Sequence, residues 1–360
     1  MSEFQIRKND LAKARIIDTP LPTAKHGEIV VKVDKFAFTA NNLTYGVMGE
    51  QIGYWQFFPA QDNEKGDWGI LPVWGFADVV ESRADGIDVR ERLFGYFPPA
   101  AYLSMVPVGV SALRLIDGSA HRAHLPPGYN LYRRVKAEPG YNPELDNERM
   151  LLFPLHITSF CLWDCLQDKD WYGAKQSIVI SASSKTSIGL AYALKADENA
   201  PPTIGLSSKR NLELLNKLDI YDATLSYDNI KDIDSAIPTV IVDMSGNASL
   251  LAALHSHLGD NMLHCINVGL THWEQSHSDE GVNSERSEFF FAPSHIQKRL
   301  KDWGPEGFEQ KSTQFMFTTT RKCREWLTLR KIDGISGLAE IYHDICEGKI
   351  APDEGLIVQL

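Results

Sequence analysis

The sequence predicts an α/β protein in two parts, a β-rich first part followed by a doubly wound parallel sheet. In the first part, short apolar runs alternate with Gly and Pro, which is typical of the strands of a small sandwich or partial barrel. After about residue 150, continuous apolar runs that suit buried parallel strands alternate with helical segments. The length of 360 residues is enough for about two domains.

The strands of the first part follow from the period of its apolar residues. Residues 27–38 alternate apolar and polar side chains, which is the pattern of a half-buried strand. Residues 68–82 and 91–107 contain similar short apolar runs. Residues 109–147 are rich in Pro, Gly, Tyr and Arg and predict a long connection between the domains, of the kind that is usually functional or mobile.

The second part predicts five strands that alternate with helices, which indicates a parallel doubly wound sheet. The strands are expected at residues 177–181, 201–208, 223–227, 238–246 and 262–270. The helices are expected at residues 151–167, 183–196, 208–220 and 248–260.

The end of the chain returns to β structure. A helix from residue 338 stops at Gly348, and residues 354–360 read as a closing strand. We therefore expect the C-terminal segment to complete the first domain. The predicted division is a β-rich domain of residues 1–145 completed by 318–360, and a nucleotide-binding domain of residues 146–317.

Charge and cysteine content exclude several classes of partner. A net charge of −11 argues against binding to nucleic acid or to an anionic membrane, because either needs a positive surface. No uninterrupted apolar run approaches about 18 residues, and the N-terminal residues lack the apolar core of a secretory signal. Five scattered cysteines, an odd number, fit a reducing compartment. We expect a cytoplasmic protein with no nucleic-acid or membrane partner.

The turn after the strand at 177–181 is the predicted phosphate site. A Rossmann-type dinucleotide fold needs G-x-G-x-x-G here, so that backbone amides and a helix N-terminus approach the pyrophosphate. Only the last glycine is present, and hydroxyl residues and a lysine replace the rest. These groups suit phosphate oxygens, although a hydroxyl-rich helix N-cap explains the same pattern. The residues expected to hold the phosphates are Ser183, Ser184, Lys185, Thr186, Ser187 and Gly189.

The end of the second strand favours NADP(H) over NAD(H). In NAD-binding domains an acidic residue about 20 positions beyond the glycines takes the ribose hydroxyls. Here two hydroxyl residues and two cations stand in place of the acid, which suits the additional phosphate of NADP. An ordinary helix start with exposed basic residues is the alternative interpretation. The residues concerned are Ser207, Ser208, Lys209 and Arg210.

Two further strand ends are candidates for contact with the nicotinamide. Gly246 and Gly269 follow the fourth and fifth strands, where a glycine lets a flat ring approach the backbone. Asp243 ends the fourth strand, and it suits a structural cap equally well. Residues 184–187 also bear a faint similarity to the G-K-[ST] of a P-loop, but the glycine-rich loop upstream is absent.

The chain resembles the medium-chain dehydrogenase/reductase superfamily over nearly its whole length. The segments that carry the resemblance are residues 27–50, 177–195, 204–228, 239–270 and 338–360. More narrowly, TANNLTYG, YWQFFPA, SASSKTS and EFFFAPSHIQKRLKDWG are similar to an uncharacterised bacterial and fungal branch catalogued as a domain of unknown function. The resemblance implies a GroES-like catalytic domain, an inserted Rossmann domain that binds NADP(H), and a homodimer.

No metal site is predicted. Zinc-dependent members of the superfamily use Cys, His and acidic ligands, whereas here the first 160 residues contain no cysteine and no C-x-x-C occurs. His121 and His124 are three positions apart but have no third ligand in the sequence. The resemblance therefore points to the zinc-free branch of quinone oxidoreductases and enoyl thioester reductases, which transfer hydride from NADPH to an activated C=C or C=O.

The resemblance also suggests catalytic residues. The superfamily's N-x-x-D turn corresponds to Asn42–Tyr45, with Tyr45 in place of the acid, and Tyr54 lies near the position where enoyl reductases carry a proton-donating tyrosine. A phenol can protonate a developing enolate, and the Asn42 amide can orient a carbonyl oxygen. Core or rim positions are the alternative for both tyrosines.

The sequence thus predicts an NADP(H)-dependent, zinc-free oxidoreductase that reduces a small, fairly apolar carbonyl compound of the enone, quinone or enoyl type. The alternative of a different class is a non-catalytic nucleotide- or ligand-binding protein that retains the dehydrogenase fold. A P-loop phosphotransferase is a third hypothesis, which predicts Mg-dependent ATP binding that is lost in Lys185→Ala.

Overall fold

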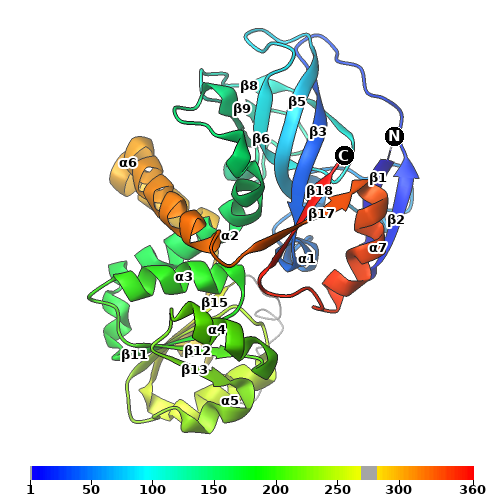
Figure 1. Ribbon diagram of the computed structural model, residues 1–360. Coiled ribbons are helices and arrows are strands. Elements are labelled where there is room, and N and C mark those ends of the chain that lie inside the picture. Colours follow the sequence, from blue (N-terminus) through cyan, green and yellow to red (C-terminus); the bar gives the residue numbers. More distant parts are fainter. Residues whose placement is uncertain (1, 269–281) are drawn as a thin grey trace. The chain divides into compact units, whose positions relative to one another are not determined.

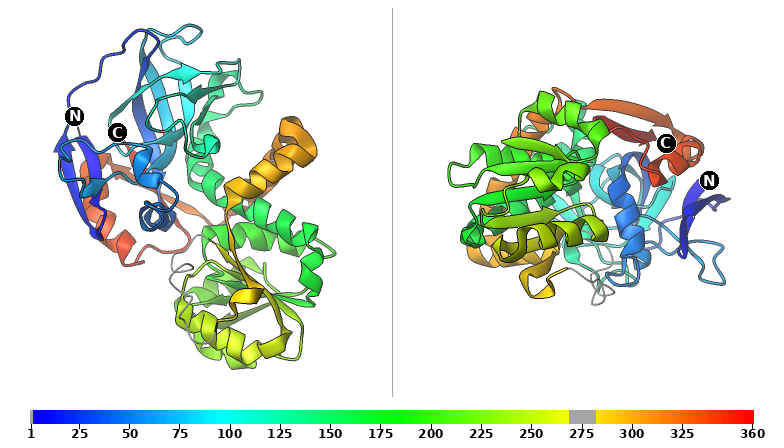
Figure 2. Two further views of the ribbon diagram at one scale, coloured as in Figure 1. Left: turned by 180° about the vertical axis from the view of Figure 1, so that it is seen from behind. Right: turned by 90° about the horizontal axis from the view of Figure 1, so that it is seen from below.

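The computed structural model describes residues 2–268 and 282–360, which form two compact units (Figure 1). Unit 1 comprises Met1–Pro154 and Trp326–Leu360, and unit 2 comprises Leu155–Glu325. The units therefore divide after residues 154 and 325, whereas the sequence-based divisions follow residues 145 and 317. The first division falls within the helix Asp146–Asp168, so no loop marks it, whereas the second falls in the short turn after the helix Ala292–Cys323. Both ends of the chain lie in unit 1 (Figures 1 and 2).

Two β-sheets form the framework of unit 1. The smaller has the order β2-β1-β4, and the larger has the order β17-β18-β3-β5-β6-β10-β9-β8, with β7 also paired to β3. Their strands are β1 (Ser2–Arg7), β2 (Asp10–Asp18), β3 (Ile29–Phe38), β4 (Trp68–Gly69), β5 (Val73–Ser82), β6 (Arg92–Phe97), β7 (Tyr102–Met105), β8 (Pro107–Val108), β9 (Arg114–Asp117), β10 (Leu131–Arg134), β17 (Thr328–Asp333) and β18 (Glu354–Gln359).

The C-terminal segment is part of the core of unit 1. Strand β18 pairs antiparallel with β3, with Val358 opposite Phe36. Helix α7 (Gly334–Cys346) packs its apolar face beside β1 and β2 (Figure 1), and its Tyr342 hydroxyl donates to the Leu11 carbonyl at 2.7 Å. The Tyr342 ring lies edge-on to Phe4, with 5.2 Å between ring centroids. Residues from both ends of the chain thus bury one another.

Residues 109–147 are not a connection between domains, and that sequence-based prediction is wrong. Strands β9 and β10 within this stretch pair with each other, and β10 also pairs with β6 of the larger sheet. Pattern reasoning fails here because the segment buries polar side chains instead of a continuous apolar face. Arg122, Asp117 and Asn130 are all at most 3% exposed and satisfy one another's hydrogen bonds.

Unit 2 contains a six-stranded parallel sheet with the order β13-β12-β11-β14-β15-β16. In chain order this is 3-2-1-4-5-6, so the order reverses between β11 and β14, where doubly wound folds bind their ligands. The strands are β11 (Gln176–Ile180), β12 (Thr203–Ser207), β13 (Ala223–Ser226), β14 (Thr239–Asp243), β15 (Met262–Val268) and β16 (Ser287–Phe290). The first five coincide closely with the predicted strands.

Helices flank the sheet of unit 2 (Figure 2). They are α3 (Lys185–Ala196), α4 (Leu212–Leu218), α5 (Ala248–Leu258) and α6 (Ala292–Cys323), together with the unit 2 part of α2 (Asp146–Asp168). The segment Pro143–Asp168 is long and apolar enough to cross a membrane by length and composition, although no uninterrupted apolar run marks it in the sequence. Its apolar window is 67% buried, as in a core helix of a soluble protein, which passes the same test.

Candidate functional site

The turn between β11 and α3 places a helix N-terminus at the point where the strand order reverses. Strand β11 ends at Ile180, Ser181 adopts a left-handed conformation with φ of +61°, and α3 begins at Lys185. Ser184 caps the helix, and its hydroxyl accepts from the Ser187 N–H at 3.1 Å. The first N–H groups of an α-helix point out of its N-terminus, so this edge suits an anionic group. The four-residue connection is too short to be the loop of a P-loop.

The serine hydroxyls predicted to touch phosphate are hydrogen-bonded within unit 2. Ser183 shares a hydrogen bond with Ser207 at 3.0 Å, and it accepts from Asn211 Nδ2 at 2.8 Å. The Ser184 hydroxyl lies 2.8 Å from the Ser187 hydroxyl, which itself lies 3.1 Å from the Met244 sulfur. These hydroxyls hold the turn together, where other dinucleotide folds use glycines.

Gly189 is required by packing. A Cβ at this position would lie 2.7 Å from the Ser159 hydroxyl oxygen and 2.8 Å from Cδ2 of His156, so α2 and α3 approach closely here. His156 is fully buried, and burial lowers the pKa of its imidazole to about 3. Lys185 and Thr186, between the cap and this contact, are half-buried.

The end of β12 presents cations beside this turn. Ser207 is buried and Ser208 is half-buried, whereas Lys209 and Arg210 in the short helix η6 (Lys209–Asn211) are exposed. The hydrogen bond from Asn211 to Ser183 ties η6 to the turn that precedes α3. Two of the four predicted groups, Lys209 and Arg210, are thus open to solvent beside the helix N-terminus.

The end of β14 is a closed turn. Asp243 Oδ1 accepts from the Ser245 N–H at 2.8 Å and from its hydroxyl at 2.7 Å, and Gly246 has a left-handed φ of +61°. Burial raises the pKa of the Asp243 carboxyl above its ordinary value. Gly269, the candidate after the fifth strand, lies outside the described residues.

In unit 1, Asn42 anchors the start of α1 (Ala40–Val47). Its Oδ1 accepts from the Thr39 N–H at 2.7 Å, and its Nδ2 donates to the Pro72 carbonyl at 2.8 Å. Both ends of the amide are therefore engaged by backbone. This arrangement fixes α1 against the strand β5 and thereby positions Tyr45, one turn further along.

Four tyrosines, Tyr45, Tyr54, Tyr96 and Tyr129, form a buried group that we term the tyrosine cluster. The Tyr45 and Tyr54 rings, both predicted as candidates, have centroids 4.7 Å apart, and the hydroxyls of Tyr54 and Tyr129 lie 2.8 Å apart. Burial raises the pKa of Tyr45 and of Tyr54 above the usual range, so both remain protonated at physiological pH.

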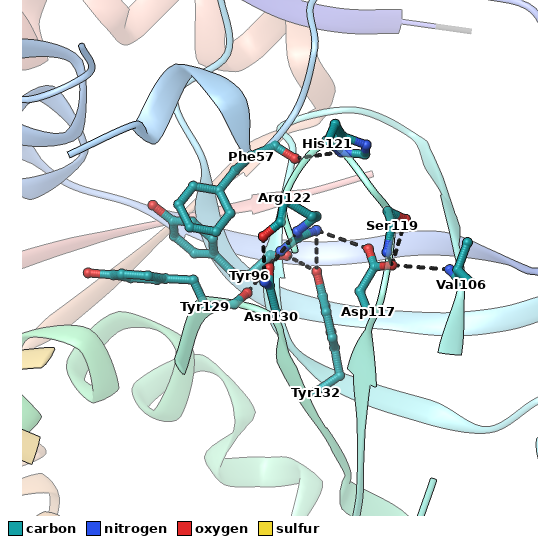
Figure 3. Close-up of polar contacts among 10 residues, drawn as sticks. All are labelled: Phe57, Tyr96, Val106, Asp117, Ser119, His121, Arg122, Tyr129, Asn130 and Tyr132. Atoms are coloured by element: carbon teal, nitrogen blue, oxygen red, sulfur yellow. Dashed lines mark hydrogen bonds and ion pairs between the residues drawn. The ribbon is translucent and has the colours of Figure 1, made fainter. Parts of the chain in front are cut away.

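A buried arginine holds this cluster in place (Figure 3). Arg122 is 0% exposed, and its Nη2 donates to the Tyr129 carbonyl at 2.9 Å. Its Nη1 pairs with Asp117 at 3.2 Å and donates to the Tyr132 hydroxyl at 3.1 Å, and Tyr132 in turn donates to the Tyr96 carbonyl. The guanidinium therefore fixes the backbone at two members of the cluster.

Trp74, on the strand next to that of Tyr96, lies beside the tyrosine cluster. It lies on β5 directly opposite Tyr96 on β6, and the two ring centroids are 5.3 Å apart. A small cavity of about 10 Å³ adjoins Trp74 and Tyr45. Its described lining contains no charged side chain, and it comprises Ala37, Thr39, Asn41, Asn42, Tyr45, Trp74, Met150, Leu151 and Pro154.

Sequence reasoning did not single out Trp74, Tyr96, Tyr129 or Arg122. One signal for Tyr129 and Arg122 existed, because they lie in the long Pro- and Gly-rich stretch in which functional residues are expected. Trp74 and Tyr96 come together only through the register of β5 and β6, which no local pattern reveals.

The described residues contain no group of three His, Cys, Asp or Glu side chains placed to hold a metal ion. The two histidines weighed above have separate partners. His121 Nε2 lies 3.2 Å from the Phe57 carbonyl oxygen, and His124 Nε2 lies 3.0 Å from Gln56 Oε1.

The strand order of unit 2 and a β-rich unit completed by the C-terminus define the medium-chain dehydrogenase/reductase fold, with a GroES-like and a Rossmann domain. The predicted fold class is thereby confirmed. The chain belongs to the family described as "Protein of unknown function (DUF2855)", whose sequence profile matches residues 36–351. No curated protein sequence matches it.

Solved structures share this fold at low sequence identity. CurA from Vibrio vulnificus, crystallised in complex with NADPH, is 12% identical with a TM-score of 0.64, covering 100% of this chain and 99% of its own. The quinone oxidoreductase from Coxiella burnetii is 12% identical with a TM-score of 0.57, covering 100% and 99%. The CurK enoyl reductase is 10% identical with a TM-score of 0.57, covering 99% and 98%.

Proposed function

We propose that this protein is a zinc-independent oxidoreductase that binds NADP(H) in unit 2 and reduces an activated C=C or C=O of a small, fairly apolar carbonyl compound. The observation that carries the proposal is the pair of exposed cations, Lys209 and Arg210, at the end of β12, where NAD-binding domains have an acid. The similar structure of CurA with NADPH supports the same cofactor.

The residues of unit 2 fit the cofactor in two places. The N–H groups at the start of α3 would hold the pyrophosphate, because they point out of the helix at the switch in strand order. Ser208, Lys209 and Arg210 would hold the 2′-phosphate, since cations on an exposed turn grip phosphate oxygens. Ser183, Ser187 and Ser207 would act by keeping the turn in shape.

Bound NADPH would supply the hydride. In unit 1, Tyr45 would supply the proton, because its hydroxyl is protonated at physiological pH and a phenol can protonate an oxygen or carbon on which negative charge develops. The hydride would add to carbon, the π electron pair would move towards the carbonyl oxygen, and the Tyr45 proton would complete the reduction. The phenolate left at Tyr45 would then take a proton from solvent. Tyr54 would support Tyr45 through ring contact, and Asn42 would position α1.

The alternative is a binding protein that has kept the fold without turnover. The internal hydrogen bonds of Ser183 and Ser187 favour it, since these hydroxyls are already satisfied without a ligand. Nucleotide binding without reduction of any enone, quinone, aldehyde or enoyl thioester would make this alternative the better account.

The first test is calorimetric titration of the protein with NADPH and with NADH. We expect NADPH to bind more tightly, and we expect Lys209→Ala/Arg210→Ala to weaken NADPH about tenfold, the effect of one charge-assisted hydrogen bond. The matched control is Lys175→Ala/Lys195→Ala, which removes two cations next to the start of β11 and at the end of α3, at the opposite edge of the sheet. If the Lys209→Ala/Arg210→Ala variant binds NADPH as tightly as the parent protein does, these two cations do not hold the 2′-phosphate.

A further inference from the structure

Trp74 and Tyr45 in unit 1 carry buried hydrogen-bond donors without an acceptor among the described residues, and the neighbouring Tyr96 hydroxyl has no hydrogen-bond partner there either. Trp74 is 8% exposed, and its indole Nε1 has no hydrogen-bond partner in the described part of the chain. The Tyr45 hydroxyl accepts from Asn41 Nδ2 at 3.1 Å, but among the described residues no acceptor for its own proton is found. Buried donors in native proteins are nearly always satisfied, so these two together call for an acceptor from outside the described residues.

The Trp74 and Tyr45 donors lie close together. Burial raises the pKa of Tyr45. The Trp74 N–H and the Tyr96 hydroxyl lie near enough to act in the opposite direction, yet neither is within hydrogen-bond geometry. Trp74 cannot turn away, because its ring is held between Tyr96 at 5.3 Å and Phe153 at 5.0 Å. Both side chains also line the small cavity of about 10 Å³.

The cavity has the size and the chemistry of a site for one oxygen atom. A volume of about 10 Å³ is at the lower limit for a single water molecule, so one carbonyl oxygen fits. The lining supplies neutral donors from Trp74, Tyr45 and Asn41, and apolar surface from Met150 and Pro154. Without a cation nearby in the described lining, an anionic head group would lose its hydration without compensation.

We propose that the Trp74 N–H and the Tyr45 O–H together bind the carbonyl oxygen of an uncharged conjugated aldehyde, ketone or quinone. This inference rests on the proposed function for the identity of the bound molecule as the hydride acceptor. It makes Trp74 a catalytic residue, because its N–H touches the oxygen on which negative charge develops during reduction. It also narrows the substrate to molecules that carry no charge beside the reacting carbonyl.

The test uses a probe and requires no nucleotide. 4-Dimethylaminocinnamaldehyde is an uncharged conjugated aldehyde whose absorption moves to longer wavelength when its carbonyl oxygen accepts hydrogen bonds. We expect a red shift on binding to the intact protein, a smaller shift and about three- to tenfold weaker binding in Trp74→Phe and in Tyr45→Phe, and no shift in the double variant. Trp163→Phe is the matched control, since that indole N–H already donates to Asp197.

A second measurement uses only the parent protein, so its result does not depend on whether the variants fold. In protein labelled with ¹⁵N at its tryptophan indoles, the Trp74 N–H resonance should move when 2-cyclohexen-1-one is added, and the Trp163 resonance should not. The proposal would be overturned if the Trp74 resonance does not move. It would also be overturned if the Trp74→Phe variant shifts the absorption of the aldehyde as far as the parent protein does. A red shift of the aldehyde in a protein that does not bind NADPH would support the oxygen site and contradict the proposed reductase function. NADPH binding without a red shift would contradict only the oxygen site.

Discussion

In the turn before α3 and the first turn of that helix, the hydroxyls of Ser183, Ser184 and Ser187 are all hydrogen-bonded inside unit 2. In unit 1, by contrast, the Trp74 N–H is buried with no partner among the described residues. By residue type the serine turn is the more evident ligand site. By hydrogen bonding, the serine hydroxyls are satisfied, whereas the Trp74 N–H is not. Residue type therefore identifies candidates, and only the partners of each atom separate ligand-binding groups from structural ones.

The two units also differ in how they hold a buried ionisable side chain. Unit 1 keeps Arg122 beside Asp117 with each of its guanidinium nitrogens hydrogen-bonded. Unit 2 keeps His156 next to Thr319, and burial lowers the pKa of its imidazole. A paired buried charge is costly to break, and a buried neutral imidazole is costly to protonate. We therefore expect unit 1 to lose stability when Arg122 is replaced, and unit 2 to lose stability when the pH falls.

The largest expected effect is the loss of the buried arginine. Arg122→Met leaves the Asp117 carboxylate buried without its partner, and we expect the free energy of unfolding of unit 1 to fall by about 3–5 kcal/mol. Urea unfolding followed by near-ultraviolet circular dichroism of the tyrosine cluster measures this loss. Arg114→Met, at an exposed position of β9, is the control and should change it by at most about 0.5 kcal/mol. Similar stabilities of the two variants would contradict the role of the Arg122 network.

An intermediate effect is expected from acid. The folded-state pKa of His156 is about 3, below the ordinary value of 6.5, so between these values the unfolded chain binds a proton that the folded chain does not. Stability is therefore lost as the pH falls, and this one residue contributes a loss of about 2 kcal/mol between pH 7 and pH 5. His156→Gln should be less stable at pH 7 but lack that share of the acid dependence.

The control for the acid effect is His343→Gln, because His343 is exposed on α7. It should show the full acid dependence of the parent protein in urea unfolding at both pH values. If His156→Gln loses stability towards pH 5 as steeply as His343→Gln does, the imidazole of His156 is not held neutral by burial.

Much of the fold could be predicted from local pattern, and much of the site could not. Continuous apolar runs located β11 to β15 closely, because a strand buried on both faces must be apolar throughout. The stretch that holds Arg122 was misjudged, because a charged side chain normally indicates the surface. Burial of Arg122 depends on partners at Asp117 and Asn130, whose approach requires the pairing of β9 with β10.

The candidate site was also predicted only in part, because strand pairing brings some of its residues together. Tyr45 and Tyr54 were identified through resemblance, and the structure places their rings in contact. Asn42 was expected to face a carbonyl oxygen, and the structure shows its amide on backbone groups, a matter of local geometry that residue type does not determine. Trp74 depends on strand register, so nothing short of the fold indicates it.

The smallest expected effect distinguishes structural from ligand-binding hydroxyls in unit 2. Ser183→Ala removes the oxygen that meets Ser207 and Asn211, and we expect a loss of about 0.5–1.5 kcal/mol in the free energy of unfolding of unit 2. NADPH affinity, measured by calorimetry, should change less than it does in Lys209→Ala/Arg210→Ala, because the hydroxyl is already satisfied. A variant with unchanged stability and about tenfold weaker NADPH binding would place Ser183 on the phosphate, and the contrast between the two units would then disappear.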